Sequence, residues 1–121
     1  MKHCLIVDDS SPIRKVLGRI LEDMSIRTSE AETRAEALEV CRSEMPDCII
    51  VDWRLPDGET LEFLSAVRQM DEGTKPTVFY LTSEYDPLRI SRAVRCGATT
   101  HLMKPFDRDI LTQAFSEAGL A

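Results

Sequence analysis

Short hydrophobic runs alternate along this chain with longer stretches in which apolar residues recur every three or four positions. The short runs are typical of strands buried on both faces, and the wider spacing is typical of amphipathic helices. Five strands are therefore predicted, each followed by a helix. The strands cover residues 3–8, 26–31, 48–52, 77–82 and 99–103, and the helices cover residues 12–24, 33–44, 59–70, 87–96 and the stretch after Asp107.

Two of these elements have surfaces that the pattern describes further. The second strand carries Arg27, Ser29 and Glu30, and such polar residues predict a position at the edge of the sheet. The fourth helix is expected to turn its apolar positions toward the core. These positions are Leu88, Ile90, Ala93 and Val94.

Strands and helices that alternate in this order build an α/β fold. Because the connection between two parallel strands is almost always right-handed, helices are expected on both faces of the sheet. The prediction is a three-layer α/β/α sandwich around a five-stranded parallel sheet. Residues 1–121 contain no repeat, linker or low-complexity tract, so a single domain without an effector domain is expected.

Composition excludes several classes of function. The formal net charge of −6 argues against nucleic-acid binding, so DNA is not an expected partner. No apolar run approaches the roughly 20 residues of a membrane span, and the N-terminus does not form a secretory signal, so a cytoplasmic protein is expected. The cysteines lack metal-ligand spacing and are expected to pack as free thiols. They are Cys4, Cys41, Cys48 and Cys96.

Candidate chemistry lies where the predicted strands end. Asp8 and Asp9 come after the first strand, Asp52 ends the third, Thr82 ends the fourth and Lys104 follows the fifth. Parallel strands bring their carboxyl ends to one edge of a sheet, so these five side chains are expected to meet in one crevice. Neighbouring carboxylates repel one another unless a cation lies among them, and ligands that are all oxygen favour Mg²⁺.

The same side chains suit phosphoryl chemistry. An aspartate can attack phosphorus, while an ammonium group and a hydroxyl contact the phosphoryl oxygens. Each residue alone also has an ordinary structural explanation, since Asp8-Asp9-Ser10, for example, can cap a helix. Their joint position at matching strand ends favours the functional interpretation.

Four segments carry a resemblance to a known family, namely Leu5–Ser10, Val51–Pro56, Leu81–Ser83 and Met103–Phe106. Through them the chain resembles the receiver domains of two-component response regulators over essentially its whole length. The Asp-Trp-x-x-Pro segment and the Lys-Pro-Phe-Asp-Arg-Asp-Ile ending look most like stand-alone chemotaxis regulators of the CheY type. The resemblance implies a flavodoxin/CheY-like sheet with strand order 2-1-3-4-5.

The resemblance also implies how the acidic residues work. Asp52 would be the phosphoacceptor, and the donor would be a histidine kinase or a phosphotransfer protein. Mg²⁺ would bind Asp9, Asp52 and the backbone carbonyl of Arg54, with Asp8 assisting. The protein would not be an enzyme beyond Mg²⁺-dependent self-phosphorylation and autodephosphorylation.

A monomeric switch with an output surface is the remaining implication. Thr82 and Lys104 would contact the phosphoryl group, and the face around the fourth helix and fifth strand would then change. That face would bind a downstream protein, for which the flagellar motor is an example. His101 occupies the switch position, where the family usually has an aromatic residue.

Two departures from the family pattern concern the loops around the site. The Asp-Gly pair of Pro56–Thr60 comes earlier than in the family, which leaves the conformation of this loop open. Arg54 and Glu84 flank the expected path of the hydrolytic water, where they could form a salt bridge.

Two other functions compete with the switch. A phosphatase of the haloacid dehalogenase type also uses a strand-end aspartate, but its second acid lies two residues on, and here that position is Ser10. A receiver fold that acts as a binding module is the alternative. Arg89, Arg92 and Arg95 on the fourth helix would then bind an anionic ligand such as a cyclic dinucleotide, unless they only form a solvated face.

Overall fold

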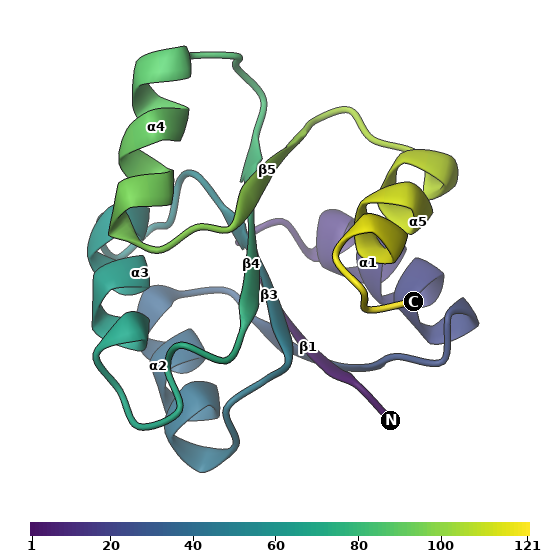
Figure 1. The fold of residues 1–121 in the computed structure, drawn as a ribbon, viewed down its shortest axis with the longest axis horizontal. Helices are drawn as coiled ribbons and strands as arrows, with labels where there is room; N and C mark the ends of the chain where they lie inside the picture. Colours follow the sequence, from purple (N-terminus) through teal and green to yellow (C-terminus); the bar gives the residue numbers. More distant parts are fainter.

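The computed structural model describes residues 1–121 and contains one parallel sheet whose strand order is β2-β1-β3-β4-β5 (Figure 1). This order confirms the fold predicted from the sequence, and each predicted element is present with ends that differ by at most two residues. The strands are β1 His3–Val7, β2 Arg27–Ala31, β3 Cys48–Asp52, β4 Thr77–Thr82 and β5 Thr100–Met103. The helices are α1 Ser11–Asp23, α2 Arg34–Ser43, α3 Thr60–Arg68, α4 Pro87–Cys96 and α5 Arg108–Glu117.

Helices cover both faces of the sheet, as the alternating pattern predicts. In Figure 1, α1 and α5 lie on one side of the strands, and α2, α3 and α4 lie on the other. Alternate residues of a strand point to opposite faces, so each strand contributes to two cores. In β1, Leu5 and Val7 belong to the core under α2–α4, whereas Cys4 and Ile6 belong to the core under α1 and α5.

The register of the strands brings the candidate residues to one level. Val7 pairs with Val51, so the residues that follow β1 lie beside the end of β3. Thr82 pairs with Met103, so Lys104 follows at the same edge. All five residues of β1 and of β3 are buried, whereas β2 lies at one edge of the sheet, as predicted, and only its last residue, Ala31, is buried.

Helix α4 corrects one prediction. Its only buried residue is Ala93, while Leu88 and Val94 are 59% and 48% exposed, so the prediction that these two face the core was wrong. The helix lies beside α3, near the edge of the sheet that the four-residue strand β5 forms. That narrow support accommodates one small side chain and leaves the other apolar positions at the surface.

The cysteines and the helix lengths bear on two further expectations. All four cysteines are free, and three of them are buried in the two cores, as expected for thiols that pack like small hydrophobic residues. Among the helices, none combines the length and the apolar character that a membrane span requires.

Candidate functional site

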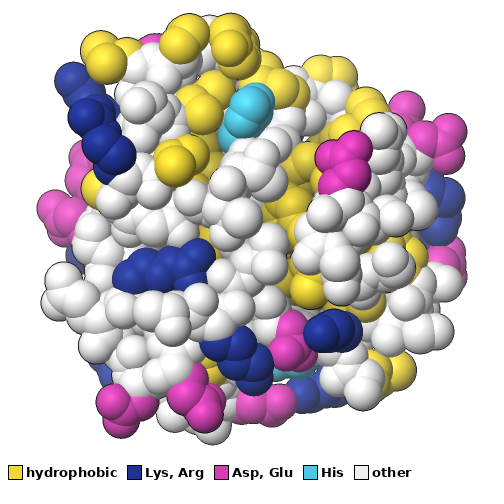
Figure 2. All heavy atoms as spheres, in the orientation of Figure 1, with side chains coloured by type: hydrophobic (Ala, Val, Ile, Leu, Met, Phe, Trp, Pro, Cys, Tyr) yellow, Lys and Arg dark blue, Asp and Glu magenta, His cyan; other side chains and the backbone are white.

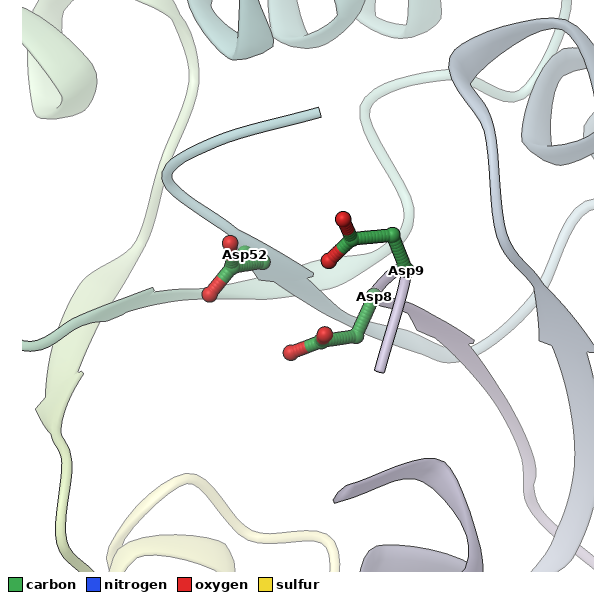
Figure 3. A group of neighbouring side chains, drawn as sticks. All are labelled: Asp8, Asp9 and Asp52. Carbon is green, nitrogen blue, oxygen red and sulfur yellow. The ribbon is translucent and has the colours of Figure 1, made fainter. Parts of the chain in front are cut away.

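Three carboxylates converge where β1 and β3 end. Asp8 and Asp9 follow β1, and Asp52 is the last residue of β3 (Figure 3). One oxygen from each carboxylate can be chosen so that all three lie within 4.8 Å of one another. Asp8 and Asp52 are only 1% and 5% exposed, whereas Asp9 is exposed. The cluster therefore has a buried floor and one side chain at the rim.

Backbone N–H groups orient the two buried carboxylates. The Ser10 amide donates to Asp8 Oδ1 at 2.8 Å, and the Arg54 amide donates to Asp52 Oδ2 at 3.1 Å. Each acid thus accepts a hydrogen bond from the residue two positions later, a local geometry that aspartate favours where a strand turns into a loop. The turns hold both carboxylates towards the same crevice.

Thr60 supports the site, and sequence reasoning missed it. Its hydroxyl is buried at the start of α3 and donates to the backbone carbonyl of Asp52 at 2.8 Å. This bond ties the first turn of α3 to the end of β3. A threonine at a predicted helix start is a visible signal, but it indicates capping rather than contact with a strand eight residues earlier.

Lys104 supplies the cation of the site. Its ammonium lies 2.7 Å from Asp52 Oδ1 and 3.3 Å from Asp8 Oδ2, and no other donor reaches that Asp52 oxygen. Burial raises the pKa of Asp52, and the Asp8 charge adds to this rise, while Lys104 opposes it. Burial alone would lower the pKa of Lys104, but the bonds and charges of Asp52 and Asp8 outweigh it and raise that pKa. The ammonium is therefore held in its charged form.

The donor set fits Mg²⁺. This ion takes oxygen ligands at about 2.1 Å, so two oxygens on opposite sides of it are about 4.2 Å apart. The 4.8 Å span of the three carboxylates is only slightly wider, and the exposed Asp9 side chain is free to close the difference. Two acids buried side by side also retain a net negative charge that a single lysine does not cancel. The carboxylates are an acidic triad suited to magnesium.

The Thr82 side chain is hydrogen-bonded to the backbone of Glu84 in this structure. The fully buried Thr82 hydroxyl donates to the Glu84 carbonyl at 3.0 Å and accepts from the Glu84 amide at 3.2 Å. The Glu84 carboxylate lies 3.7 Å from Arg89 Nη1, and Arg54 forms no ion pair. The salt bridge suggested between Arg54 and Glu84 is thus absent, because the Arg54 guanidinium lies over the Trp53 ring instead, 4.2 Å from its centroid.

The predicted output residues divide into two groups. His101 is half-buried on β5, paired in register with Tyr80, and its ring lies 6.1 Å from the Tyr85 ring. Arg89 and Arg92 line a cleft of about 440 Å³ beside the loop after β3, whereas Arg95 is exposed and lies outside it. Whether these arginines bind a ligand stays a prediction.

The loop at Pro56–Thr60 has a definite structural role. The Asp57 carboxylate accepts hydrogen bonds from the Arg34 and Ala35 amides at 2.7 and 3.0 Å, so it caps the N-terminus of α2. Gly58 has a φ of 150°, which favours glycine, and the Arg34 guanidinium occupies the space where a Cβ would lie. The early Asp-Gly pair therefore anchors this loop to α2 and takes no part in the cluster of Asp8, Asp9 and Asp52.

A doubly wound parallel sheet with an acidic triad and a lysine at its carboxyl edge defines the class of the CheY-like α/β proteins. The sequence profile of the response regulator receiver domain family matches residues 4–116. The chain belongs to this family, and it is a receiver domain of a two-component system.

Several characterised proteins are similar to the chain over most of their length. Chemotaxis protein CheY of Halobacterium salinarum is 31% identical over 116 residues, which are 96% of this chain and 95% of that protein. Sporulation initiation phosphotransferase F of Bacillus subtilis is 31% identical over 110 residues, 91% of this chain and 87% of that protein. The structure of chemotaxis response regulator CheY4 of Vibrio cholerae superposes with a TM-score of 0.92 at 31% identity, covering 97% of this chain and 98% of that one.

Proposed function

We propose that this receiver domain is a phosphorylation-dependent switch and that Asp52 is its phosphoacceptor. The observation that carries the proposal is the acidic triad at one sheet edge, with the Lys104 ammonium 2.7 Å from Asp52. Membership in the receiver family implies a kinase as phosphodonor. The proposed donor is a histidine kinase or a phosphotransfer protein.

In the proposed reaction a carboxylate oxygen of Asp52 attacks the phosphorus of a phosphohistidine. The P–N bond breaks and its electron pair stays on the imidazole, while a P–O bond to Asp52 forms. Asp9, Asp52 and the Arg54 carbonyl, with Asp8 assisting, would hold Mg²⁺, which would offset the negative charge of the phosphoryl oxygens. Lys104 moves from the carboxylate to a phosphoryl oxygen. Water later hydrolyses the acyl phosphate, and no other enzymatic activity is proposed.

The proposed output face is formed by α4 and β5. Because α4 has a single buried residue, Ala93, a small displacement of this helix exposes little of the core. Thr82 would exchange its bonds with Glu84 for one to a phosphoryl oxygen, which frees the loop that carries Tyr85 beside His101. Figure 2 shows hydrophobic side chains gathered around a histidine over this part of the molecule.

A role in chemotaxis, with the flagellar motor as target, is the finer part of the proposal. Similarity to the CheY proteins of H. salinarum and V. cholerae supports it, although the sporulation phosphotransferase is equally identical, at 31%. The formal charge of −6 supports a protein target rather than DNA. Free cysteines support a reducing compartment, so the proposal includes the cytoplasm as the location. A monomer is also part of the proposal.

Phosphorylation by a small donor tests the central claim. The chain is incubated with acetyl phosphate and Mg²⁺, and the added phosphoryl group is located by mass spectrometry. Wild type should carry one group on Asp52, and Asp52→Asn should carry none. Asp57→Asn, the same change in an exposed carboxylate that caps α2, should be labelled like wild type. Stoichiometric labelling of Asp52→Asn would remove the phosphoacceptor from the proposal.

Partner binding tests the finer claim. Wild type and Asp52→Asn are treated with beryllofluoride, which mimics the phosphoryl group, and are titrated with purified flagellar switch proteins and with a purified phosphotransfer protein. Beryllofluoride should strengthen binding of wild type to the flagellar switch and leave Asp52→Asn unchanged. Binding to the phosphotransfer protein alone would replace the motor role by a phosphorelay role.

A further inference from the structure

A basic cleft lies beside the acidic site, and apart from the Arg54 backbone carbonyl its residues have no part in the metal and phosphoryl chemistry described above. Its walls are the loop after β3 and the N-terminal half of α4, and its volume is about 440 Å³. Trp53, Arg54 and Tyr80 line one side, while Arg89 and Arg92 line the other. Asp52 is not among the lining residues, although its neighbour Trp53 is.

The charge of this cleft is opposite to that of the molecule. Three arginines and one acid, Glu59, line it, which leaves a formal charge of +2 in a chain of formal charge −6. Arg54 and Arg92 form no ion pair, whereas five arginines elsewhere in the chain are paired with a carboxylate. Cations that lack a partner inside a protein surface rich in acids mark a place where an external anion is favoured.

Arg89 is incompletely satisfied in this cleft. Its Nη1 atom is buried and no hydrogen-bond acceptor reaches it, since the nearest carboxylate, that of Glu84, lies 3.7 Å away. The guanidinium is held over the Trp53 ring, 4.4 Å from its centroid, so stacking rather than hydrogen bonding fixes its position. A buried charged donor without an acceptor is costly, and an incoming oxyanion would relieve that cost.

We propose that this cleft binds a small phosphate-bearing anion through Arg54, Arg89 and Arg92. Guanidinium groups present paired N–H donors whose planar geometry matches phosphate oxygens. The volume falls within the range of about 300–1,000 Å³ that is typical of small-molecule sites. The guanidinium planes of Arg54 and Arg89 beside Trp53 also offer flat surfaces on which the ring of a nucleotide stacks.

Fluorescence of Trp53 provides a direct test, because it is the only tryptophan in the chain and contacts two of the three arginines. The full chain is titrated with pyrophosphate, AMP or adenosine in metal-free buffer, at an ionic strength held constant with chloride. Pyrophosphate and AMP should give saturable changes, and adenosine, which lacks phosphate, should give none. AMP binding about tenfold tighter than pyrophosphate identifies a nucleotide ligand, and equal affinities identify the phosphate group as the determinant. Calorimetry measures the same affinities without relying on the tryptophan.

Matched variants separate this cleft from general electrostatics. Arg92→Gln should weaken anion binding about tenfold, because one charge-assisted contact is lost. Arg95→Gln makes the same change one turn further along α4, outside the cleft, and should bind like wild type. Both residues are exposed, so neither change disturbs the core, and circular dichroism checks the fold.

A variant of the acidic site distinguishes anion binding in the cleft from phosphorylation of Asp52. Asp52→Asn cannot accept a phosphoryl group but should keep anion binding, so failure of the phosphoacceptor proposal and failure of this one give different results. Absence of saturable binding of either anion by both methods would overturn the proposal. Equal weakening in Arg92→Gln and Arg95→Gln, or loss of binding in Asp52→Asn, would overturn it as well.

Discussion

Replacement of Lys104 by methionine tests the electrostatics of the acidic site. The ammonium of Lys104 is the only cation in contact with the carboxylates of Asp52 and Asp8, residues that are 5% and 1% exposed. Methionine keeps much of the length and apolar contact of the side chain but removes the charge. The variant therefore leaves two nearly buried carboxylates without their counter-ion, and it should be less stable than wild type in metal-free buffer.

The size of the effect follows from burial. Removal of one partner from a buried ion pair costs about 3–5 kcal/mol, and the lower end applies here because the Lys104 side chain is still 23% exposed. Unfolding entropy of about 2.1 cal/mol/K per residue corresponds to about 0.25 kcal/mol/K for this chain. A loss of about 3 kcal/mol should therefore lower the melting temperature by about 12 °C.

Added Mg²⁺ should partly restore the variant. At a concentration ten times its dissociation constant, Mg²⁺ stabilises wild type by about 1.4 kcal/mol, or about 6 °C. In Lys104→Met the ion no longer meets a neighbouring ammonium, so its affinity should rise at least about tenfold. At the same concentration the stabilisation then approaches about 2.7 kcal/mol, or about 11 °C. Thermal unfolding followed by circular dichroism measures all four melting temperatures.

Lys75→Met is the matched control. Lys75 pairs with Asp47 at 3.6 Å, away from the carboxylate cluster, and its side chain is 48% exposed. Exposed pairs contribute about 0–1 kcal/mol, so this variant should melt close to wild type and respond to Mg²⁺ as wild type does. The same Mg²⁺ response in Lys104→Met and wild type would refute the idea that the lysine and the metal compete for one set of carboxylates.

Three further predictions concern the supports of the fold. Thr60→Val removes the hydroxyl that donates to the Asp52 carbonyl and should cost about 1 kcal/mol in urea unfolding, whereas Thr60→Ser should be near wild type; equal losses would contradict this role. Burial, aided by the charge of Arg27, lowers the pKa of His3 below 6.5. The unfolded chain then binds a proton at His3 more readily than the folded chain does. The contribution of His3 to the stability of the fold is therefore present above pH 6.5 and is lost as pH falls through the lowered folded-state pKa. His3→Gln should flatten this part of the stability profile, and an unchanged slope would assign the pH dependence to other groups. Burial raises the pKa of Cys41 to about 11, and Cys4 and Cys48 are buried as well. The half-buried Cys96 should therefore be the only thiol that a disulfide reagent labels at pH 8 before denaturation. A second thiol that reacts quickly would contradict that expectation.

Much of the fold is local in origin, which is why the sequence predicts it. Hydrophobic period distinguishes strands from helices over windows of a few residues, and every element was found where its pattern indicated. The polar residues of β2 placed it at an edge for an equally local reason, since a strand with water on one side tolerates Arg27 and Glu30. The right-handed crossover rule then leaves few ways to arrange alternating elements.

The acidic triad was predictable for a related reason. A buried parallel strand excludes a carboxylate from its interior, so Asp8 and Asp52 had to come at strand ends. Parallel strands share an orientation, and their carboxyl ends therefore meet at one edge. No side-chain detail is needed for this inference, and the structure brings the three acids together as expected.

Tertiary structure alone decided which side chains pair around that triad. The sequence suggested that Glu84 could pair with Arg54, yet Glu84 lies near Arg89. Arg54 instead stacks on Trp53, and α4 brings a second guanidinium over the same ring. The contact of Thr60 with the Asp52 carbonyl likewise depends on where α3 begins relative to β3.

The exposed face of α4 shows the same limit. The spacing of apolar residues identifies an apolar stripe on this helix, but it does not give the width of the protein surface against which the helix packs. Beside α3 and near the sheet edge, that surface buries Ala93 and leaves Leu88 and Val94 in solvent. The sequence by itself determined the elements, their order and the chemistry at the strand ends, since these follow from period, burial and strand direction. Helix docking decided the ion pairs, the basic cleft and the exposed face, because such contacts depend on differences of a few ångströms between elements distant in the chain.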